Sequence, residues 1–484
     1  MSVEKRVQIE YIESVFRENA DREFVVDSNL DLSLTYRDVF ELSGVVARVF
    51  LERGACSGKN IAIILPNCFE FVLVYFACMH HGVVPVPVNP SLLGKEASFI
   101  VETSGAEVLV TSEKLAVQFA SCVESFGERA MALPLAGDCK EEGRRLDWFN
   151  DLNQRREPGN IGFPNLKDDS RALIMYTSGT TSVPKGVMLK YGPTFANGRE
   201  FIRAVGIREA SSFYGILSLA YMGGWYNLMI IPCLAGGKVV LDHAFNAKSL
   251  FNFWDKVKRF GVDVLWLVPT IMTLLMTSKK KDAGAFAKDQ IKLGLVGTAP
   301  LPVSLKREFE ERFGFETLEN YGLSETLLIT TNAGGGEDAP GSVGKAMRGC
   351  EIKIVPVTPG DKDGEILVKT DYLMEGYFKN EKDFVVENGF FRTGDIGYLD
   401  EKGRLFITGR KKDLIIRGGI NISPGQIEKV LYDFPGVEEA AVVGIPSSLL
   451  GEEIVAFVKI EAEKAGSFQV GDLQERCSRE LSKF

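Results

Sequence analysis

Between Tyr176 and Gly186 the chain carries a run of hydroxyl side chains that ends in a lysine, YTSGTTSVPKG. Apolar segments at 172–175 and 187–189 flank this run, which predicts a loop between two β-strands. Backbone N–H groups and hydroxyls donate to phosphate oxygens, and a lysine adds a point charge. A flexible Ser/Thr linker is the alternative, but a linker has no need of the Pro-Lys-Gly ending. The loop is therefore predicted to wrap a polyphosphate.

The loop is not a Walker A motif, because no glycine directly precedes Lys185 and no Ser or Thr follows it. Two of its residues, Thr177 and Lys185, are expected to act in catalysis as well as binding. The phosphate-binding residues expected here are Thr177, Ser178, Gly179, Thr180, Thr181 and Lys185.

Three later segments accompany the loop: 320–326 (NYGLSET), 391–395 (FRTGD) and 409–413 (GRKKD). Together the four segments closely resemble the motifs of the adenylate-forming superfamily, the acyl-CoA synthetases and their relatives. The resemblance covers nearly the whole chain, and the motifs in combination are highly specific. Ser182 and Ser324 depart from it, since the family usually has glycine at the first position and often threonine at the second.

The resemblance implies roles for single residues. Tyr321 would stack on adenine, Ser324 would contact the α-phosphate and Glu325 would hold Mg²⁺. Asp395 would accept hydrogen bonds from both ribose hydroxyls, and Arg410 would contact the ribose or a phosphate. Taken alone, Glu325 is equally well explained as a solvated charge at a helix start, and Asp395 as a turn residue. The remaining nucleotide-binding residues expected are Gly297, Ala299, Pro300, Asn320 and Gly322.

In the family a small C-terminal domain rotates about a hinge, first for adenylation and then for thioester formation. Lys412 stands at the hinge position and is included among the catalytic residues. Gly418 and Gly419 resemble the segment that lines the pantetheine tunnel of coenzyme A (CoA), although a solvated basic patch is the alternative. No residue matches the family's C-terminal adenylation lysine, because the chain stops at Phe484. We therefore expect weakened adenylation, of order a thousandfold.

The segment 217–225, LSLAYMGGW, resembles the part of the family that shapes the acid pocket. No acidic residue occurs between Ser211 and Gly237, so an α-amino acid, whose ammonium needs a carboxylate partner, is disfavoured. An apolar acid, fatty or aromatic, is expected instead, with core packing as the alternative role for each side chain. The expected pocket residues are Tyr221, Gly223, Trp225, Val268 and Leu323.

Composition excludes several other functions. A net charge of −9 argues against a nucleic-acid partner. The eight cysteines form no CxxC pair and there are three histidines, so a thiolate or imidazole metal site is not supported. The N-terminus lacks the apolar core of a signal peptide, which points to the cytoplasm. The uncharged segment 211–237 is long enough to span a bilayer, but Gly223-Gly224, Pro232 and Gly236-Gly237 divide it, and we expect a buried helix and strand.

These residues must be positioned by an alternation of strands and helices. Residues 8–50 look largely helical, and thereafter the pattern predicts a βαβ succession with parallel strands covered by helices. Ser423, Pro424 and Gln426 predict a helix start with a capping box. The expected strands are 62–65, 83–88, 108–111, 262–268, 291–296, 440–445 and 454–460, and the expected helices include 69–80, 97–102, 250–260 and 470–481.

The fold class expected is α/β, with a large multi-subdomain α/β domain at 1–410 and a small, incomplete α+β domain at 411–484. The function expected is ATP-dependent activation of an apolar carboxylic acid, fatty or aromatic, as an acyl adenylate and its transfer to CoA, with Mg²⁺. A carrier-protein thiol is the alternative acceptor. A non-catalytic nucleotide or acyl-adenylate binding protein is the alternative from another class.

Overall fold

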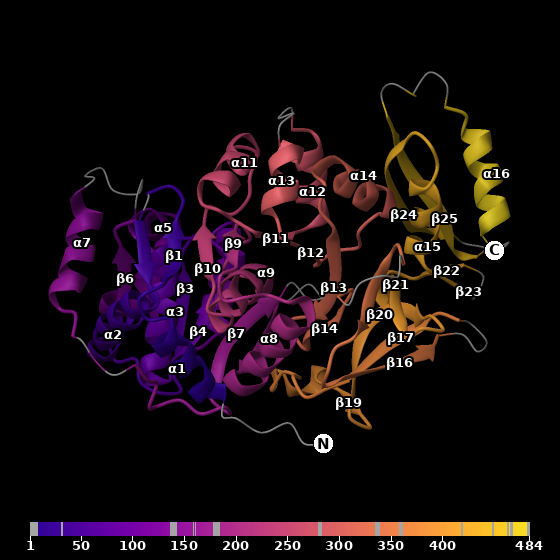
Figure 1. Cartoon of the computed structure of the whole chain (residues 1–484). Helices are drawn as coiled ribbons and strands as arrows, with labels where there is room; N and C mark the ends of the chain where they lie inside the picture. Colours follow the sequence, from indigo (N-terminus) through magenta and orange to yellow (C-terminus); the bar gives the residue numbers. More distant parts are fainter. Residues whose placement is uncertain are drawn as a thin grey trace.

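Four β-sheets organise the described part of the chain, in a mixed α/β fold with a large N-terminal domain and a smaller C-terminal one (Figure 1). The structure is a computed structural model. It describes residues 8–30, 32–135, 143–157, 159, 161–177, 184–278, 283–333, 339–357, 362–417, 420–447, 450–461, 464 and 468–481.

The N-terminal segment is helical at both ends and extended in the middle. Its elements are α1 (Gln8–Glu18), β1 (Glu23–Asp27), β2 (Leu32–Thr35) and α2 (Tyr36–Glu52). The expectation of a largely helical 8–50 is wrong for the two strands. The β-branched Val25 and Val26 pair with β10, and Thr35 caps α2 through a capping box with Asp38, so the local sequence restarts the helix there.

A parallel four-stranded sheet confirms the predicted βαβ succession. Its order is β4 (Val84–Pro87), β3 (Asn60–Ile64), β5 (Ala106–Ser112) and β6 (Ala130–Leu133). All of β3 is buried, as expected for a strand covered on both faces. The helices of this part are α3 (Phe69–His81), α4 (Gly94–Thr103), α5 (Glu113–Gln118), α6 (Ala120–Phe126), η1 (Gly127–Arg129) and α7 (Gly143–Gln154).

The two strands predicted around the hydroxyl-rich loop are present and antiparallel. They are β7 (Arg171–Thr177) and β8 (Lys185–Lys190), with Thr177 opposite Lys185. The short strand β18 (Gly376–Tyr377) pairs with β8, bringing a segment nearly 200 residues later beside the loop. Helix α8 (Tyr191–Val205) follows β8.

The largest sheet formed by the described residues has fourteen strands, and it changes from parallel to antiparallel pairing along its width. Strands β9 to β13 pair in parallel. The pairing of β13 with β14 and all the later pairings in this sheet are antiparallel. The strands first introduced here are β9 (Ser212–Gly215), β10 (Lys238–Leu241), β11 (Val264–Leu267), β12 (Leu293–Val296), β13 (Thr317–Leu323), β14 (Leu327–Thr331), β15 (Ser342–Ala346), β16 (Cys350–Pro356), β17 (Gly364–Thr370), β19 (Val386–Glu387), β20 (Phe390–Leu399) and β21 (Arg404–Arg410). The helices are α9 (Met222–Trp225), η2 (Tyr226–Ile230), α10 (Ile231–Leu234), α11 (Ser249–Arg259), α12 (Pro269–Met276), α13 (Ala283–Gln290), α14 (Val303–Phe313) and η3 (Glu381–Asp383).

The C-terminal elements stand at one end of the molecule (Figure 1, yellow). An antiparallel sheet in the order β23, β22, β25, β24 carries two helices. The elements are η4 (Lys411–Asp413), β22 (Ile415–Arg417), β23 (Ile420–Ile422), α15 (Pro424–Tyr432), β24 (Val437–Ser447), β25 (Gly451–Ile460) and α16 (Val470–Glu480).

The start of α15 departs from the predicted capping box. Ser423 is the N-cap and Pro424 follows it, but Ser423 makes no side-chain capping bond. Its hydroxyl donates instead to the carbonyl of Thr408 at 2.6 Å, and Gln426 donates to the carboxylate of Asp363 at 2.8 Å. The two side chains therefore attach α15 to neighbouring parts of the chain, and tertiary partners replace the local motif.

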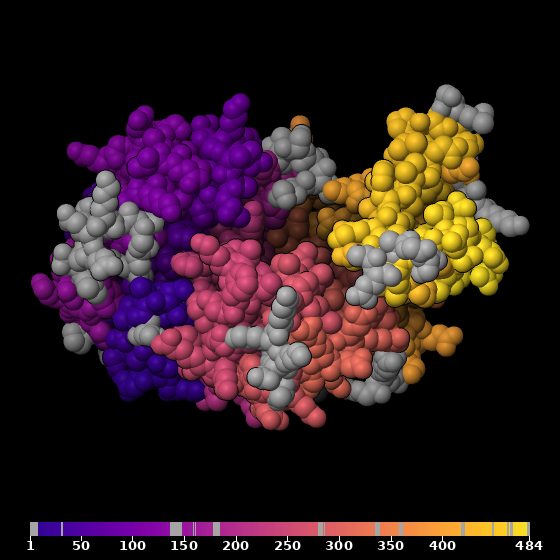
Figure 2. Space-filling model, turned by 90° about the horizontal axis from the view of Figure 1, so that it is seen from above, coloured from indigo at the N-terminus to yellow at the C-terminus, as the bar shows by residue number. Residues whose placement is uncertain are grey.

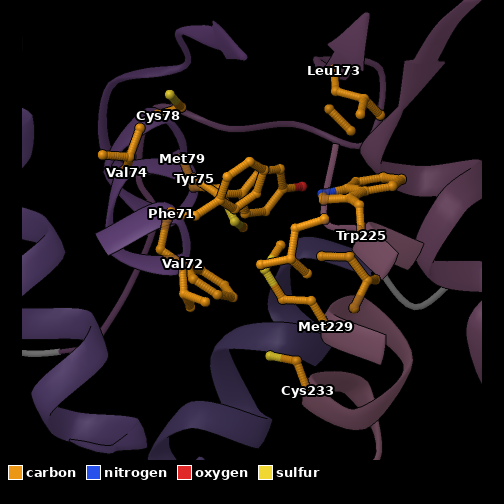
Figure 3. Packing of buried hydrophobic residues seen from close by; sticks show 14 of the residues in the cluster. Phe71, Val72, Val74, Tyr75, Cys78, Met79, Leu173, Trp225, Met229 and Cys233 are labelled. Atoms are coloured by element: carbon orange, nitrogen blue, oxygen red, sulfur yellow. The ribbon is translucent and has the colours of Figure 1, made fainter. Parts of the chain in front are cut away.

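The uncharged segment 211–237 forms strand β9, the helical turns α9, η2 and α10, and buried chain around them, as predicted. Trp225 is fully buried against Tyr75 of α3, with ring centroids 5.7 Å apart, and Met229 lies on the same side (Figure 3). Within the described ranges, no helix has the length and apolar character that a membrane span requires.

The loop before α9 is held by a buried asparagine. Asn67 donates to the carbonyls of Leu217 at 2.9 Å and Asp242 at 3.1 Å, and its carbonyl oxygen accepts from the backbone of Leu219 at 2.9 Å. One side chain from the parallel sheet region thus fixes the entry to α9 and the residues that follow.

A buried histidine gives the fold a pH dependence. Burial lowers the pKa of His80 to about 4, and its Nε2 lies 3.0 Å from the Ser43 hydroxyl and 3.1 Å from the Phe40 carbonyl. Because the folded state disfavours the charged form, we expect the free energy of unfolding to fall by about 3 kcal/mol as pH drops from 6.5 to 4. Urea unfolding across this range should show a smaller fall for His80→Gln. Equal slopes for the wild-type protein and His80→Gln would contradict the assignment.

Candidate active site

One cleft of about 540 Å³ is lined by ten of the site residues singled out in the sequence. Seen from above, the surface is hollowed between the violet part of the chain and the yellow C-terminal part (Figure 2). The cleft is lined by Thr177, Lys185, Met222, Gly223, Tyr226, Asn227, Trp266, Gly297, Thr298, Asn320, Gly322, Leu323, Ser324, Glu325, Leu327, Leu328, Glu365, Tyr377, Phe391, Arg392, Thr393, Gly394 and Arg410. It lies at the carboxyl ends of β11, β12 and β13, where ligands of open α/β sheets usually bind.

The two ends of the predicted phosphate loop, Thr177 and Lys185, both line the cleft. The four residues predicted between them, 178–181, lie outside the residues that the structure describes. Gly186 next to the lysine is required by packing, because a Cβ there would stand 2.9 Å from the Ile174 side chain. The loop is therefore anchored where the antiparallel strands β7 and β8 pack closely together.

The ammonium group of Lys185 already has a partner in the cleft wall. Its Nζ lies 2.5 Å from Oδ2 of Asp383 and 5.2 Å from the ring centroid of Tyr377. The hydrogen bond from Lys185 lowers the pKa of Asp383, and Asn380 donates to the same oxygen at 2.8 Å. An anion that enters the cleft would thus compete with Asp383 for this lysine.

Tyr377 connects this lysine to the predicted metal carboxylate. Its hydroxyl donates to Oε1 of Glu325 at 2.8 Å, while its ring lies against Lys185. Burial raises the pKa of Tyr377, so the hydroxyl stays protonated and acts as a donor. Sequence reasoning missed Tyr377 and Asp383, because neither stands in a recognisable motif and each contacts its partner across more than 50 residues.

Asp395 and Arg410 face each other across β20 and β21, with Arg410 Nε 3.0 Å from Asp395 Oδ1. The Tyr321 hydroxyl donates to the other carboxylate oxygen at 2.7 Å. Burial raises the pKa of Asp395, whereas the tyrosine and the arginine lower it. Arg410 lines the cleft and Asp395 lies directly behind it. Tyr321 is buried, and in this structure its contact with the site is through the hydroxyl group.

The turn after β12 contributes Gly297 and Thr298 to the cleft, whereas the predicted Ala299 and Pro300 are exposed and do not line it. Thr298 has φ +73°, a left-handed conformation that is unusual for a β-branched residue and typical of functional sites. Asn320, Gly322 and Ser324 of the second motif are also present in the lining.

Two of the five residues predicted for the acid pocket line the cleft. Gly223 and Leu323 line the cleft, but Tyr221 is 41% exposed and Trp225 is fully buried in the core. Neither of them lines the cleft, and nor does Val268. Met222, Tyr226 and Asn227 take their place. Sequence reasoning missed these three residues, because the π-helical turn at Tyr226–Ile230 changes which side chains of the segment share one face.

Lys412, the predicted hinge residue, does not line the cleft. Lys412 is 43% exposed at the end of β21, and its closest carboxylate contact, to Asp413, is 4.0 Å long. Gly418 and Gly419 lie outside the part of the chain that the structure describes. Among the described residues no cluster of three or more His, Cys, Asp or Glu side chains is placed to hold a metal ion.

Comparison with known proteins gives consistent matches over the whole chain. Residues 12–378 match the family model "AMP-binding enzyme", and residues 426–484 match "AMP-binding enzyme C-terminal domain". The chain is 29% identical over 473 residues to a sulfoacetate–CoA ligase of Cupriavidus necator, covering 96% of this chain and 89% of that one. It is 30% identical over 465 residues to a 2-succinylbenzoate–CoA ligase of Bacillus pumilus, covering 94% and 88%.

Solved structures agree with these matches. The crystal structure of ATP-bound MatB from Rhodopseudomonas palustris superposes with a TM-score of 0.86 at 26% identity, covering 99% of this chain and 93% of that one. The o-succinylbenzoate CoA synthetase of Bacillus subtilis, in complex with its acyl-adenylate intermediate, gives a TM-score of 0.79 at 27% identity, covering 98% and 92%.

The buried carboxylate of Asp395 provides a test of the site's construction. Tyr321→Phe removes one donor to it, and a buried acceptor left without its partner costs about 1 to 3 kcal/mol. We expect urea unfolding at pH 7 to show a loss of that size. Tyr432→Phe, which changes a hydroxyl without a hydrogen bond to any described residue, should change the free energy of unfolding by less than about 0.5 kcal/mol. Equal values for the two variants would show that the Tyr321–Asp395 bond contributes nothing.

Proposed function

Because this chain belongs to the AMP-binding enzyme family, we propose that it is an acid–thiol ligase that activates a carboxylic acid with ATP and transfers the acyl group to CoA. The observation that carries the proposal is the convergence of Lys185, Glu325 and the Asp395–Arg410 pair on one cleft. These groups come from motifs as far apart as residues 185 and 410. A cation, a carboxylate that can hold Mg²⁺ and a two-oxygen acceptor in one cleft suit a nucleoside triphosphate.

The reaction proceeds in two balanced steps. A carboxylate oxygen of the acid attacks the α-phosphorus of ATP, the new O–P bond forms, and the bond from the α-phosphorus to the leaving pyrophosphate breaks. The CoA thiol then loses its proton and its sulfur attacks the acyl carbon. The C–S bond forms as the C–O bond to AMP breaks. The first step spreads negative charge over the phosphate oxygens. In the second step the sulfur of CoA replaces AMP on the acyl carbon.

Lys185 is the cation placed to balance that charge. In the structure it is held by Asp383, and the polyphosphate of ATP would replace this carboxylate as its partner. The Lys185 ammonium is thus already positioned in the cleft, and Asp383 balances its charge until ATP binds. Thr177, opposite Lys185 in the strand register, supplies a hydroxyl on the other side of the loop.

The nucleoside end has matching partners. Oδ1 of Asn320 is buried and accepts a hydrogen bond from no described residue, so a donor such as the amino group of adenine would satisfy it. Asp395 is the acceptor for ribose hydroxyls. Since Arg410 is about half exposed, its side chain can turn away from Oδ1 to admit them. Tyr321 keeps the carboxylate in place through the other oxygen.

Mg²⁺ fits the carboxylate of Glu325. This ion binds to one or two carboxylates together with substrate phosphates, rather than to an all-protein cage. Glu325 meets that requirement, because it lines the cleft and is bonded to Tyr377, whose ring lies against Lys185. The Tyr377 hydroxyl orients the glutamate, leaving its second oxygen for the ion. The ion, when bound, would neutralise phosphate charge and help orient the phosphates for attack.

We further propose the division of the chain at residues 410 and 411, with Lys412 as the hinge and Gly418 and Gly419 toward the pantetheine arm of CoA. Support comes from the end of β21 at Arg410, from the separate sheet that begins with β22, and from the exposed Lys412 side chain. We propose CoA rather than a carrier-protein thiol as the acceptor, because the relatives reported above are named CoA ligases. A reducing compartment, the cytoplasm, suits the free thiols of the described cysteines.

The central assignment predicts a loss of activity on removal of the lysine. Lys185→Ala should reduce acyl-adenylate formation by about 10²- to 10³-fold, as expected when a group that stabilises transition-state charge is removed. Pyrophosphate release and thioester formation with a panel of carboxylic acids measure the two steps. Lys190→Ala changes a lysine on the same strand outside the cleft and should retain activity within about twofold. Wild-type levels in Lys185→Ala would refute the role of the cleft.

A second prediction concerns Tyr377. Without its hydroxyl, Glu325 loses its orienting donor, so Tyr377→Phe should raise the Mg²⁺·ATP concentration needed for half-saturation by about tenfold, while the KM for the acid stays unchanged. Steady-state kinetics at varied Mg²⁺ test this split. Tyr398→Phe, which alters a tyrosine away from the cleft lining, is the matched control. Equal increases of both KM values would indicate a general structural defect instead.

A further inference from the structure

The cleft lining includes a nearly buried side-chain amide, that of Asn227, which makes no hydrogen bond to any described residue. Asn227 is 7% exposed and lines the cleft. No described residue forms a hydrogen bond with its side chain, yet the amide is not sealed inside the core. Buried polar groups are nearly always hydrogen-bonded, so an open amide at this depth indicates a partner that comes from outside the chain.

Two other buried asparagines, Asn67 and Asn197, are bonded within the protein. Asn67 bonds the loop before α9, as described above. Asn197 accepts from the Tyr226 hydroxyl at 2.7 Å and donates to the carbonyl of Leu328 at 2.8 Å. Asn227 differs from these two amides, because it lines the cleft and has no partner among the described residues.

The backbone around Asn227 is built to present it. Residues Tyr226–Ile230 form a π-helical turn between α9 and α10, a rare conformation found mostly at functional sites. Gly224 is obligatory, since a Cβ there would lie 2.1 Å from the Ser218 carbonyl oxygen. A Cβ on Gly223 would lie 3.2 Å from the Leu217 side chain and in van der Waals contact with the Thr298 methyl group, so a larger residue would crowd this part of the cleft.

The charges of the cleft lie elsewhere. The described cations that line it are Lys185, Arg392 and Arg410, and each is paired with a carboxylate: Lys185 with Asp383, Arg392 with Glu365 at 2.6 Å, and Arg410 with Asp395. A second anionic group on the acid would therefore meet no uncommitted cation among the described lining. The segment that carries Asn227 contains no carboxylate that could pair with an ammonium group. The substituent that suits Asn227 is neutral.

The walls of the cleft also limit the length of the acid that it can hold. Met222, Leu323 and the buried Trp266 supply apolar surface, and behind α9 the space is filled by Trp225, packed against Tyr75 (Figure 3). The cleft must hold the phosphates of the nucleotide as well as the acid within about 540 Å³. A long alkyl chain would have to displace this core, whereas a ring or a short chain would not.

We propose that the acid taken by this ligase is a compact monocarboxylic acid, aryl or short acyl, whose acyl group carries one neutral hydrogen-bonding substituent such as a hydroxyl, keto or amide group, bound by the side-chain amide of Asn227. An asparagine amide both donates and accepts, so it suits each of these groups. This inference rests on the proposed function and narrows the expected fatty or aromatic acid.

Non-hydrolysable acyl-sulfamoyl adenosines test the proposal by binding, without depending on turnover. The matched pairs are 4-hydroxybenzoyl against benzoyl, 3-hydroxybutanoyl against butanoyl, and 4-acetamidobenzoyl against 4-ethylbenzoyl, with succinyl and dodecanoyl as anionic and long-chain probes. Calorimetry on the full chain should show at least tenfold tighter binding of the substituted member in one or more pairs, because a site built to hydrogen-bond a group discriminates against analogues that lack it. Asn227→Leu should abolish that difference, and the exposed Asn153→Leu should preserve it.

Several outcomes would overturn the inference. They are equal or tighter binding of the unsubstituted member in every pair, strongest binding of the succinyl or dodecanoyl probe, or an unchanged preference in Asn227→Leu. The wild-type comparison stands even if the variant folds poorly. Failure of wild-type protein to bind AMP and every probe would overturn the proposed function, and with it this inference. Binding of AMP with no preference among acyl groups would overturn the inference alone.

Discussion

The carboxylate of Asp395 imposes the constraint around which this half of the molecule is arranged. It is 4% exposed, and a buried charge persists only when its oxygens are bonded. Tyr321 on β13 satisfies one oxygen and Arg410 on β21 the other. These contacts join the last strand of the parallel part of the large sheet to its antiparallel extension, and Arg410 is also the last residue before the C-terminal elements. A single charge thus fixes the relative placement of three segments.

The cleft exists because two different sheet architectures meet beside this charge. On one side, the turns after parallel strands bring Gly297 and Thr298 to the surface, and on the other the antiparallel strands supply Thr393 and Arg410. The β7–β8 pair closes the cleft with Lys185. Because β18 pairs with β8, the residues after Gly376 lie close enough to bond both the lysine and Glu325. No single element carries the site, which explains why its residues span more than two hundred positions.

Much of this could be predicted from the sequence, and the failures have physical causes. The strands around Lys185, and Glu325 and Arg410 as cleft residues, follow from local motifs in which the residue types are tied to short spacings. Tyr377 and Asp383 could not be predicted, since their contacts depend on the pairing of β18 with β8. At α15 the local rule predicted a capping box, but Ser423 and Gln426 bond Thr408 and Asp363 instead. Local preferences decide elements, whereas distant partners decide what polar side chains do.

The π-helical turn at Tyr226–Ile230 shows how narrowly the lining of the cleft is set. Such a turn holds one residue more than an α-helical turn, and each residue in an α-helix advances about 100° around the axis. Deleting one residue here would let the segment relax to a regular α-helix. The side chains after the deletion would then be rotated by roughly 100° about the helix axis relative to those before it. Asn227 and its neighbours would then exchange places between cleft and core. For this reason a single codon gained or lost at this point offers evolution a route to a different acid, with every other part of the machinery unchanged.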